Sequence, residues 1–422
     1  MQEIVERQAV ATLRRDAGVI GLIGVAHMTS HLCQFALPPI FPLLRAEFGV
    51  SYSALGLVIA VFYAASGVGQ ALIGILVDRH GGRPILLAGI VLLAGAVGLM
   101  AYAPAYWMLL PLAGLAGLGN SVFHPADFSI LSHGVSDGRV GRAFSVHAFC
   151  GTLGYALSPA LVASIAYATN WRLALSALAV FGLAVALAIS LFGRLIDIPG
   201  ARPRPAREGS AGALPGGAMP SPSFLALLLM PVMALAFAYL TLTAVAGTAI
   251  QTYAAAAMSA LYAVPYATAA GVVSAYLTGQ AGGILLGGPI ADRTTRHDIV
   301  AMIGLFGAAV LIAVVAFGAV SFTTAVAIMT IAGASVGLTA ASRDMLVKSA
   351  APKGATGKVF GLVYSGFDVG SMIAPLALGW LVDRGLATPT LLAIALVFLA
   401  TLATIAQVKQ NTPAAAPGWP TK

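Results

Sequence analysis

The sequence predicts an all-α polytopic membrane protein with twelve transmembrane helices in two pseudo-symmetric six-helix bundles, both termini cytoplasmic. Three observations predict this fold class. The chain of 422 residues is 59% hydrophobic and only 9% charged, whereas a soluble domain carries about 25% charged residues. Its apolar runs are long enough to cross a bilayer, which takes roughly 20 residues. The second half of the chain also repeats residue spacings of the first half.

Apolar runs of spanning length follow one another along the chain. In the first half, hydropathy predicts spans near 17–44, 53–77, 84–103, 107–132, 142–168 and 172–192. In the second half, it predicts spans near 223–252, 264–291, 298–319, 321–346, 357–382 and 386–408. The stretch between them is rich in Pro, Gly and Arg. We therefore expect a first bundle of residues 1–192, a cytoplasmic linker of residues 193–222, and a second bundle with a tail, residues 223–422.

The basic residues predict the orientation. With the N-terminus in the cytoplasm, all but three of the 22 Lys and Arg residues fall in cytoplasmic loops and tails; the exceptions are Arg45, Arg172 and Arg384. Cytoplasmic loops carry an excess of Lys and Arg, so we expect a multi-pass protein of the inner membrane with both termini inside. The net charge of +8 is scattered between apolar runs, which does not indicate a nucleic-acid partner.

A short charged hairpin recurs in the two halves. Residues 74–83 hold Asp78, Arg79 and Arg83 between two apolar runs, and Asp292-Arg293 lies 214 positions after Asp78-Arg79. Further pairs are separated by 216 positions: Gly141 and Gly357, Arg142 and Lys358, Phe144 and Phe360, Gly154 and Gly370, and Pro159 and Pro375. This colinear set predicts two halves that arose by duplication. Asp78 ends a predicted helix, where the helix dipole disfavours a carboxylate, so we expect the hairpin pair to find partners in the other half and to gate the cytoplasmic side.

Two stretches carry a resemblance to a known family. Gly74, Leu76, Asp78, Arg79, Gly81 and Arg83 resemble the loop motif between the second and third helices of the major facilitator superfamily. Residues 117–125 (Gly-Leu-Gly-Asn-Ser-Val-Phe-His-Pro), with Gly141, Ser145, Gly151, Gly154, Ser158 and Pro159 after them and His27, Gln34 and Pro42 before them, are similar to the fosmidomycin-resistance type of exporter. The resemblance implies a secondary transporter that moves a small organic compound by alternating access.

The chain departs from this exporter type at two places. Ser30 and His31 stand where those exporters carry an Asn-Asp pair, and Ala126 separates Pro125 from Asp127. The subfamily resemblance implies export of a drug-like or anionic compound in exchange for protons. Because of the departures, the substrate is not inherited from the subfamily. Proton-coupled uptake of an organic acid or other metabolite is the alternative, and a membrane sensor that does not transport is the alternative from another class.

Ionisable side chains inside spans are candidates for the site, because they are costly in a bilayer and usually functional. In the first span, His27, His31 and Gln34 follow one helical face. Either they line a polar cavity, where they bind substrate or carry protons, or they only make hydrogen bonds between helices. We expect the cavity.

The fourth span repeats this spacing with Asn120, His124 and Asp127. His147 lies near the start of the fifth span, where an interfacial position competes with a place in the site. Asp368 is the only carboxylate that we place at mid-depth, so we expect it to bind and release the coupling proton. Arg343 and Asp344 are expected at a cytoplasmic gate, each with its own partner, because adjacent residues on a helix do not face each other.

Cofactors and other partners are not indicated. His27 and His31 can hold one metal ion from a single helix turn, but the sequence identifies no third ligand, so no metal site is predicted. Cys33 and Cys150 lie inside apolar runs and indicate no disulfide framework. A nucleotide-binding Gly-Lys-Ser/Thr loop is absent from the sequence. We expect a monomer in the lipid bilayer that acts on a small-molecule substrate and H⁺, and not an enzyme.

Overall fold

The computed structural model describes residues 2–136, 139–197, 229–350 and 356–411. In the first half the helices are α1 (Gln2–Gln34), η1 (Pro38–Ile40), α2 (Phe41–Phe48), α3 (Tyr52–His80), α4 (Gly82–Met100), η2 (Tyr106–Met108), α5 (Leu109–Asn120), α6 (Phe123–Gly134), α7 (Val140–Ala168), α8 (Trp171–Phe192) and η4 (Gly193–Leu195). In the second half they are α10 (Pro231–Tyr262), α11 (Tyr266–Arg293), α12 (His297–Ala316), α13 (Phe322–Leu338), α14 (Ala340–Ala350), α15 (Thr356–Asp383) and α16 (Ala387–Asn411). Most of the expected linker lies outside the described residues.

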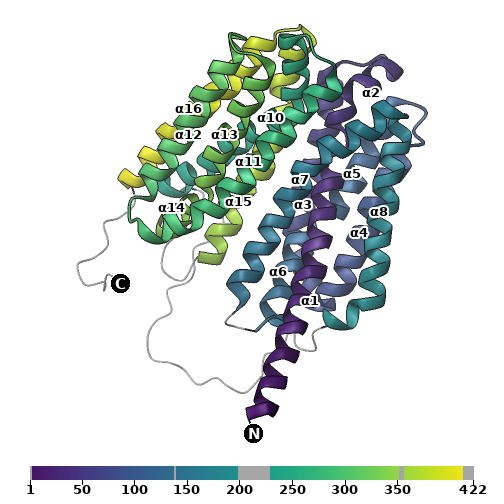
Figure 1. Ribbon diagram of the computed structural model, residues 1–422, viewed down its shortest axis with the longest axis vertical. Helices are drawn as coiled ribbons and strands as arrows, with labels where there is room; N and C mark the ends of the chain where they lie inside the picture. Colours follow the sequence, from purple (N-terminus) through teal and green to yellow (C-terminus); the bar gives the residue numbers. More distant parts are fainter. Residues whose placement is uncertain (1, 137–138, 198–228, 351–355, 412–422) are drawn as a thin grey trace.

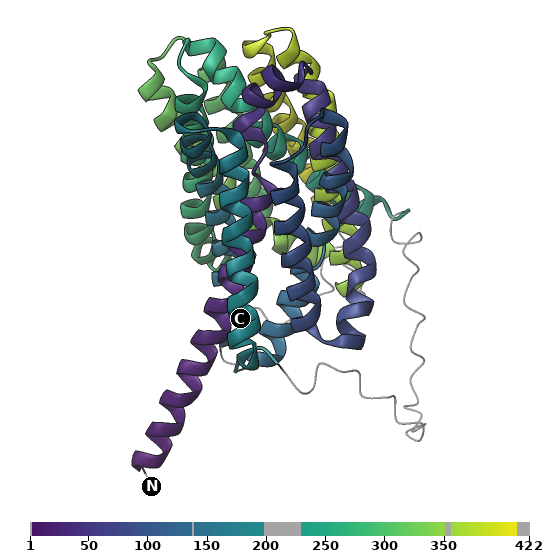
Figure 2. The same ribbon diagram turned by 90° about the vertical axis from the view of Figure 1, so that its right-hand side faces the viewer.

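The described residues contain twelve helical segments long and apolar enough to cross a membrane, which confirms the predicted all-α, twelve-span architecture; the orientation of the termini stays a prediction. Figure 1 shows the helices of the first half gathered on one side and those of the second half on the other. The first predicted span starts too late, because α1 continues as a helix to Gln2 and projects beyond the other helices (Figure 2). Helix α1 ends at Gln34, before Pro38 and Pro39, because proline has no backbone N–H to continue the α-helical hydrogen bonds.

The two halves pack in the same pattern. In the first half α1 packs on α7, α3 on α5 and α4 on α8; in the second half α10 packs on α15, α11 on α13 and α12 on α16. Between the halves, α3 packs on α15 and α11 on α7. The second span of each half therefore contacts the fifth span of the other half, as an internal two-fold relation requires.

The glycine pair Gly154 and Gly370 has equivalent surroundings in the two halves. A Cβ added to Gly154 would meet the carbonyl oxygen of Met28 in α1, and a Cβ added to Gly370 would meet that of Thr241 in α10. In each half the fifth span thus approaches the first span closely enough that only glycine fits. Close packing of these helices therefore accounts for the repeated glycine.

The fourth and tenth spans are each broken in the middle. The hydroxyl of Ser121 donates to Leu118 O (2.6 Å) between α5 and α6, and that of Thr339 donates to Val336 O (2.7 Å) between α13 and α14. Such a bond to a carbonyl three residues back competes with the helical ladder. In the fourth span Pro125 also lacks the backbone N–H that would bond to Ser121. The predicted span near 107–132 is thus one membrane-crossing segment, Tyr106–Gly134, with a helix break inside it.

The bundles are joined by hydrogen bonds at one face. The carboxylate of Asp383, at the end of α15, accepts bonds from Tyr52 N (2.5 Å), Ser53 N (3.0 Å) and Ser53 Oγ (2.5 Å) at the start of α3. We call these three residues the latch and this side of the protein the latch face. Tyr266 Oη donates to Pro38 O (2.7 Å) across the same face. A carboxylate at a helix N-terminus also interacts favourably with the helix dipole.

Candidate functional site

A cavity of about 410 Å³ lies between the bundles at the middle of their spans. Most of its lining residues carry hydroxyl, carboxamide, imidazole or charged groups, and apolar side chains such as Phe123, Ile284 and Phe367 complete the wall. The polar lining residues are His27, Ser30, His31, Gln34, Tyr63, Ser66, Gln70, Asn120, His124, Thr152 and Tyr155 from the first half, and Thr243, Thr248, Gln251, Gln280, Thr339, Arg343, Tyr364, Asp368 and Ser371 from the second. Both halves contribute polar groups, so any solute in the cavity contacts both.

The first-span stripe lines the cavity as expected. His27, His31 and Gln34 all face it, because positions i, i+4 and i+7 share one side of α1. The Nε2 atoms of His27 and His31 are 3.1 Å apart. The ring centroids of His31 and of Tyr155 in α7 are 4.1 Å apart. The stripe therefore belongs to the site, and its role in binding remains a prediction.

The fourth-span stripe divides at the helix break. Asn120 and His124 line the cavity, but Asp127 is fully buried inside the first bundle. The break between α5 and α6 changes the direction of the chain, so the i, i+7 relation of Asn120 and Asp127 no longer holds. The expectation that Asp368 is the only deep carboxylate is wrong, because Asp127 lies beside the mid-span residue His27.

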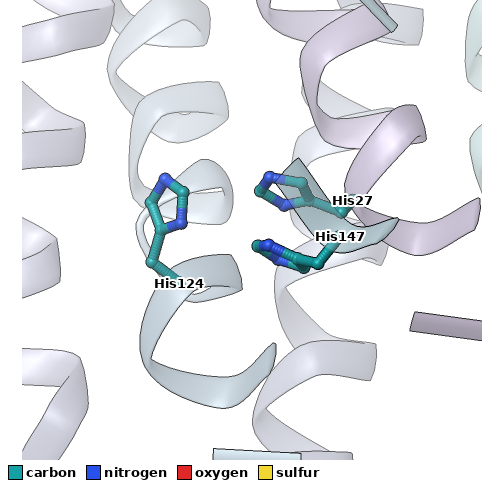
Figure 3. Close-up of side chains that lie close together, drawn as sticks. All are labelled: His27, His124 and His147. Carbon is teal, nitrogen blue, oxygen red and sulfur yellow. The ribbon is translucent and has the colours of Figure 1, made fainter. Parts of the chain in front are cut away.

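His147 of α7 is buried in the same bundle. It is 3% exposed, and its Nε2 donates to Asp127 Oδ2 (2.9 Å). Its ring stacks on that of His27 with centroids 3.6 Å apart and planes 23° apart. Figure 3 shows these two rings together, with His124 facing them from α6. The sequence places His147 only by its distance from the start of a span, which does not show that α7 approaches α1 here.

Asp368 reaches the cavity from α15. A Cβ added to Gly67 of α3 would lie 3.1 Å from Asp368 Cβ, so the carboxylate also stands where the two bundles meet. Among the residues that the structure describes, none forms an ion pair with Asp368 or donates a hydrogen bond to it. A carboxylate in this position is available to a proton or to a substrate cation.

Arg343 and Asp344 bind each other, so the expectation of separate partners is wrong. Arg343 Nε donates to Asp344 Oδ1 (2.9 Å), which also accepts from Tyr364 Oη (2.5 Å). The Cβ atoms of adjacent helical residues point in different directions, but the arginine side chain is long enough for its guanidinium group to reach the neighbouring carboxylate. Arg343 also lies 5.0 Å from the ring centroid of Phe367 and lines the cavity, so it is placed to meet an anion.

The hairpin residues lie at the opposite side from the latch, which we call the hairpin face. Arg79 and Arg293 are exposed there, and Asp78 and Asp292 have side chains outside the described set. Arg83 donates to Ser190 O (3.1 Å) and Asp197 Oδ2 (3.2 Å), both within the first half. The structure thus ties Arg83 to its own bundle, and the gating role of this group stays a prediction.

Several lining residues were missed by the sequence reasoning. Gln70, Gln251 and Gln280 line the cavity and lie in otherwise apolar spans. A carboxamide in a membrane span is costly for the same reason as a charge, so a search that included Gln would have found them. Tyr63, Tyr155 and Tyr364 carry no such signal, because tyrosine is common in membrane helices.

Two six-helix bundles that enclose a polar cavity at mid-span define a membrane transporter of the type built from internal repeats. A family model described as Major Facilitator Superfamily matches residues 23–277 and 239–420. The chain belongs to the major facilitator superfamily. This membership confirms the resemblance seen in the sequence and the prediction that the chain is not an enzyme.

The chain is similar to curated transporters over part of their length. It is 32% identical to the fosmidomycin resistance protein of Escherichia coli K12 over 152 residues, 36% of this chain and 37% of that protein. It is 25% identical to the probable sulfoacetate transporter SauU of Cupriavidus necator, over 41% of this chain and 40% of that protein. A probable L-galactonate transporter of Escherichia coli K12 is 26% identical over 34% of this chain and 32% of that protein. The chain therefore matches less than half of the length of these relatives.

Solved structures share the fold over nearly the whole chain. One is a bacterial homolog of the human lysosomal transporter Spinster in an inward-facing and occupied conformation, with a TM-score of 0.73 and 13% identity over 95% of this chain and 99% of that one. Another is the nucleoside transporter NupG, with a TM-score of 0.74 and 13% identity over 92% of this chain and 99% of that one. At this identity the likeness concerns the fold alone.

Proposed function

We propose that this protein is a proton-coupled secondary transporter of a small organic anion that works by alternating access. The observation that carries the proposal is the composition of the cavity. It combines a guanidinium group, Arg343, with imidazoles and many neutral hydrogen-bond donors, and it holds one carboxylate, Asp368, to which no described side chain donates a hydrogen bond. Such a cavity suits a hydrophilic anion better than an apolar compound or a cation.

The named relatives support an anion. Sulfoacetate and L-galactonate, for which two of them are named, are organic acids. A small carboxylate or sulfonate fits within a volume of about 410 Å³ and can be held by Arg343 from one bundle and His31 from the other. Simultaneous contact with both bundles would let the bound anion favour the state in which they close around it.

Proton coupling is assigned to Asp368. An ionised carboxylate at the contact with Gly67 resists the loss of water that accompanies closure of the bundles. Protonation removes this cost, so the proton and the substrate together bias the same rocking motion. The proposal includes export of the anion in exchange for protons, following the similarity to the fosmidomycin resistance protein. Uptake of an organic acid or other metabolite together with protons is the alternative.

The latch and the hairpin lie at opposite faces of the protein, so each can close one entrance to the cavity in turn. The latch joins the bundles at one face, and along α3 the cavity is lined by Tyr63, Ser66 and Gln70, which lie between the latch and the hairpin. We propose that the latch face is extracellular, that the hairpin face is cytoplasmic, and that both termini are cytoplasmic, with each bundle moving as a unit in the inner membrane. In the opposite state the latch opens and the hairpin carboxylate Asp78 contacts the other bundle.

A binding screen tests the substrate class and provides a first prediction. Purified protein is titrated with sulfoacetate, L-galactonate, fosmidomycin and uncharged analogues, and stabilisation against heat reports binding. We expect an anion to bind and its uncharged analogue not to. Arg343→Gln should lower the affinity for the anion about 10- to 100-fold, because a hydrogen bond to a charged group contributes about 1.5–3 kcal/mol.

Two control variants make this test specific. Arg194→Gln removes an exposed cation outside the cavity and should leave the affinity unchanged. Arg343→Gln combined with Asp344→Asn removes the carboxylate that Arg343 neutralises, so a loss of affinity shared by both Arg343 variants arises from the guanidinium itself. Preferential binding of cations or apolar compounds would overturn the proposed substrate class.

A further inference from the structure

We infer that His27, His124 and His147 form a binding site for a divalent transition-metal ion inside the first bundle, which we call the imidazole site. Ring nitrogens of all three residues lie within 4.8 Å of one another. The residues come from three helices, α1, α6 and α7, and Figure 3 shows their rings converging. Imidazole is a preferred ligand of Zn²⁺, Co²⁺, Ni²⁺ and Cu²⁺, and three histidines with an open fourth position form a well-known zinc arrangement.

A fourth imidazole stands beside the site at chelating distance. For a metal–nitrogen bond of about 2.0–2.1 Å, two nitrogens of a tetrahedral site lie about 3.3 Å apart. The Nε2 atoms of His27 and His31 are 3.1 Å apart, so this pair already has nearly that spacing. His31 also lines the cavity and is placed to complete the coordination of an ion held by His27.

Asp127 orients the ring of His147 by a hydrogen bond and lies close to the ring of His27. Its Oδ2 atom lies 2.9 Å from His147 Nε2 and 3.2 Å from His27 Nδ1. The opposite nitrogens, His147 Nδ1 and His27 Nε2, are then left to serve as ligands. Metal-binding histidines usually donate their second nitrogen to a carboxylate in this way. Asp127 is thus a positioning residue, and its negative charge offsets part of the charge of the ion.

The rings must turn slightly to bind one ion. His27 and His147 stack with planes only 23° apart, whereas an ion must lie close to the plane of each ring that binds it. The torsion about the Cβ–Cγ bond of histidine is broad in proteins, so the rotation of His27 costs little intrinsic torsional energy. The Nδ1 of His27 has a close contact with Asp127 but no aligned hydrogen bond, so the turn breaks none there.

The location of the site indicates a resident ion and not a transported one. His27, His124 and His147 belong to helices of one bundle, so rocking of the two bundles does not separate them. His124 is exposed to the cavity, which gives an ion a route in from solvent. A bound ion would join α1, α6 and α7 beside the substrate-binding wall.

Metal binding is tested directly on the full-length protein without a histidine tag. After treatment with a chelator, the protein is dialysed against Zn²⁺, Co²⁺ or Ni²⁺, and retained metal is measured by mass spectrometry. We expect one ion per chain and, with Co²⁺, the intense visible absorption of a tetrahedral nitrogen-bound ion. Asp127→Asn should weaken the affinity about 10- to 100-fold, as removal of a second-shell carboxylate does.

The variants locate the ion. His124→Ala changes a cavity-exposed residue and should abolish retention, and His147→Gln should do the same. The matched control is His133→Ala, which removes an exposed histidine of α6, the helix that also carries His124. This variant should retain as much metal as the wild-type protein. Loss of the metal in His133→Ala, equal retention in His124→Ala, or no retained metal in the wild type would each overturn the inference. These measurements require no transport, so their failure leaves the proposed function untouched.

Discussion

Replacing Asp368 by Asn is expected to abolish transport driven by a pH gradient and to leave exchange of substrate across the membrane intact. Asparagine keeps the size of the side chain but cannot bind and release a proton. With one proton per substrate, a gradient of about one pH unit supports roughly tenfold accumulation, since a unit corresponds to 1.36 kcal/mol. The variant should accumulate nothing, because the gradient no longer acts on either state.

The experiment uses proteoliposomes and a substrate identified by the binding screen. Exchange of labelled for unlabelled substrate at equal pH is the internal control, since it requires a folded and mobile protein but no proton gradient. Asp368→Glu retains a carboxylate and should restore part of the accumulation. If Asp368→Asn accumulates substrate as the wild type does, the proton is carried elsewhere.

Replacing Asp383 by Asn is expected to shift the protein toward the state that is open at the latch face. The substitution removes the charge that accepts three hydrogen bonds from Tyr52 and Ser53 of the other bundle and that faces the N-terminus of α3. A hydrogen bond to a charged group contributes about 1.5–3 kcal/mol, so the ratio of the two states should change about 10- to 100-fold. A shift of this size changes the dominant state when the two lie within a few kcal/mol.

Distances between spin labels report this shift. In a background without Cys33 and Cys150, one label pair at Tyr102 and Thr323 spans the latch face, and a second at His133 and Thr295 spans the hairpin face; all four residues are exposed. In Asp383→Asn the first distance should grow and the second should shrink. Asp78→Asn, which removes the proposed hairpin gate, should shift both in the opposite sense. Distances that stay unchanged in Asp383→Asn would show that the latch does not hold the bundles together.

The predictions that succeeded rest on local properties of the chain. Span positions follow from hydropathy, and the shared face of His27, His31 and Gln34 follows from helix geometry. The place of Asp368 at the cavity follows from counting residues along an uninterrupted helix, α15. Each of these can be read within one span, because a bilayer fixes both the length and the direction of a helix.

The predictions that failed depend on contacts between spans or on interrupted helices. Counting along the fourth span misplaces Asp127, because the chain breaks between Asn120 and Phe123. The partnership of Asp127 with His147 joins two helices, and Asp383 finds Tyr52 331 positions away. Asp383 lies at the end of a span, so without knowledge of its partner Tyr52 the sequence does not distinguish it from an ordinary loop residue. The imidazole site likewise needs α6 and α7 to be placed beside α1.

Solute counterflow tests most directly whether this protein transports at all. Proteoliposomes loaded with an unlabelled compound that binds in the screen are diluted into buffer containing the labelled compound, with no pH gradient. Alternating access predicts a transient accumulation of label above that in liposomes without protein, driven by exchange through the cavity. If a compound binds the wild-type protein and no accumulation occurs, the protein keeps the fold of a transporter but acts as a sensor.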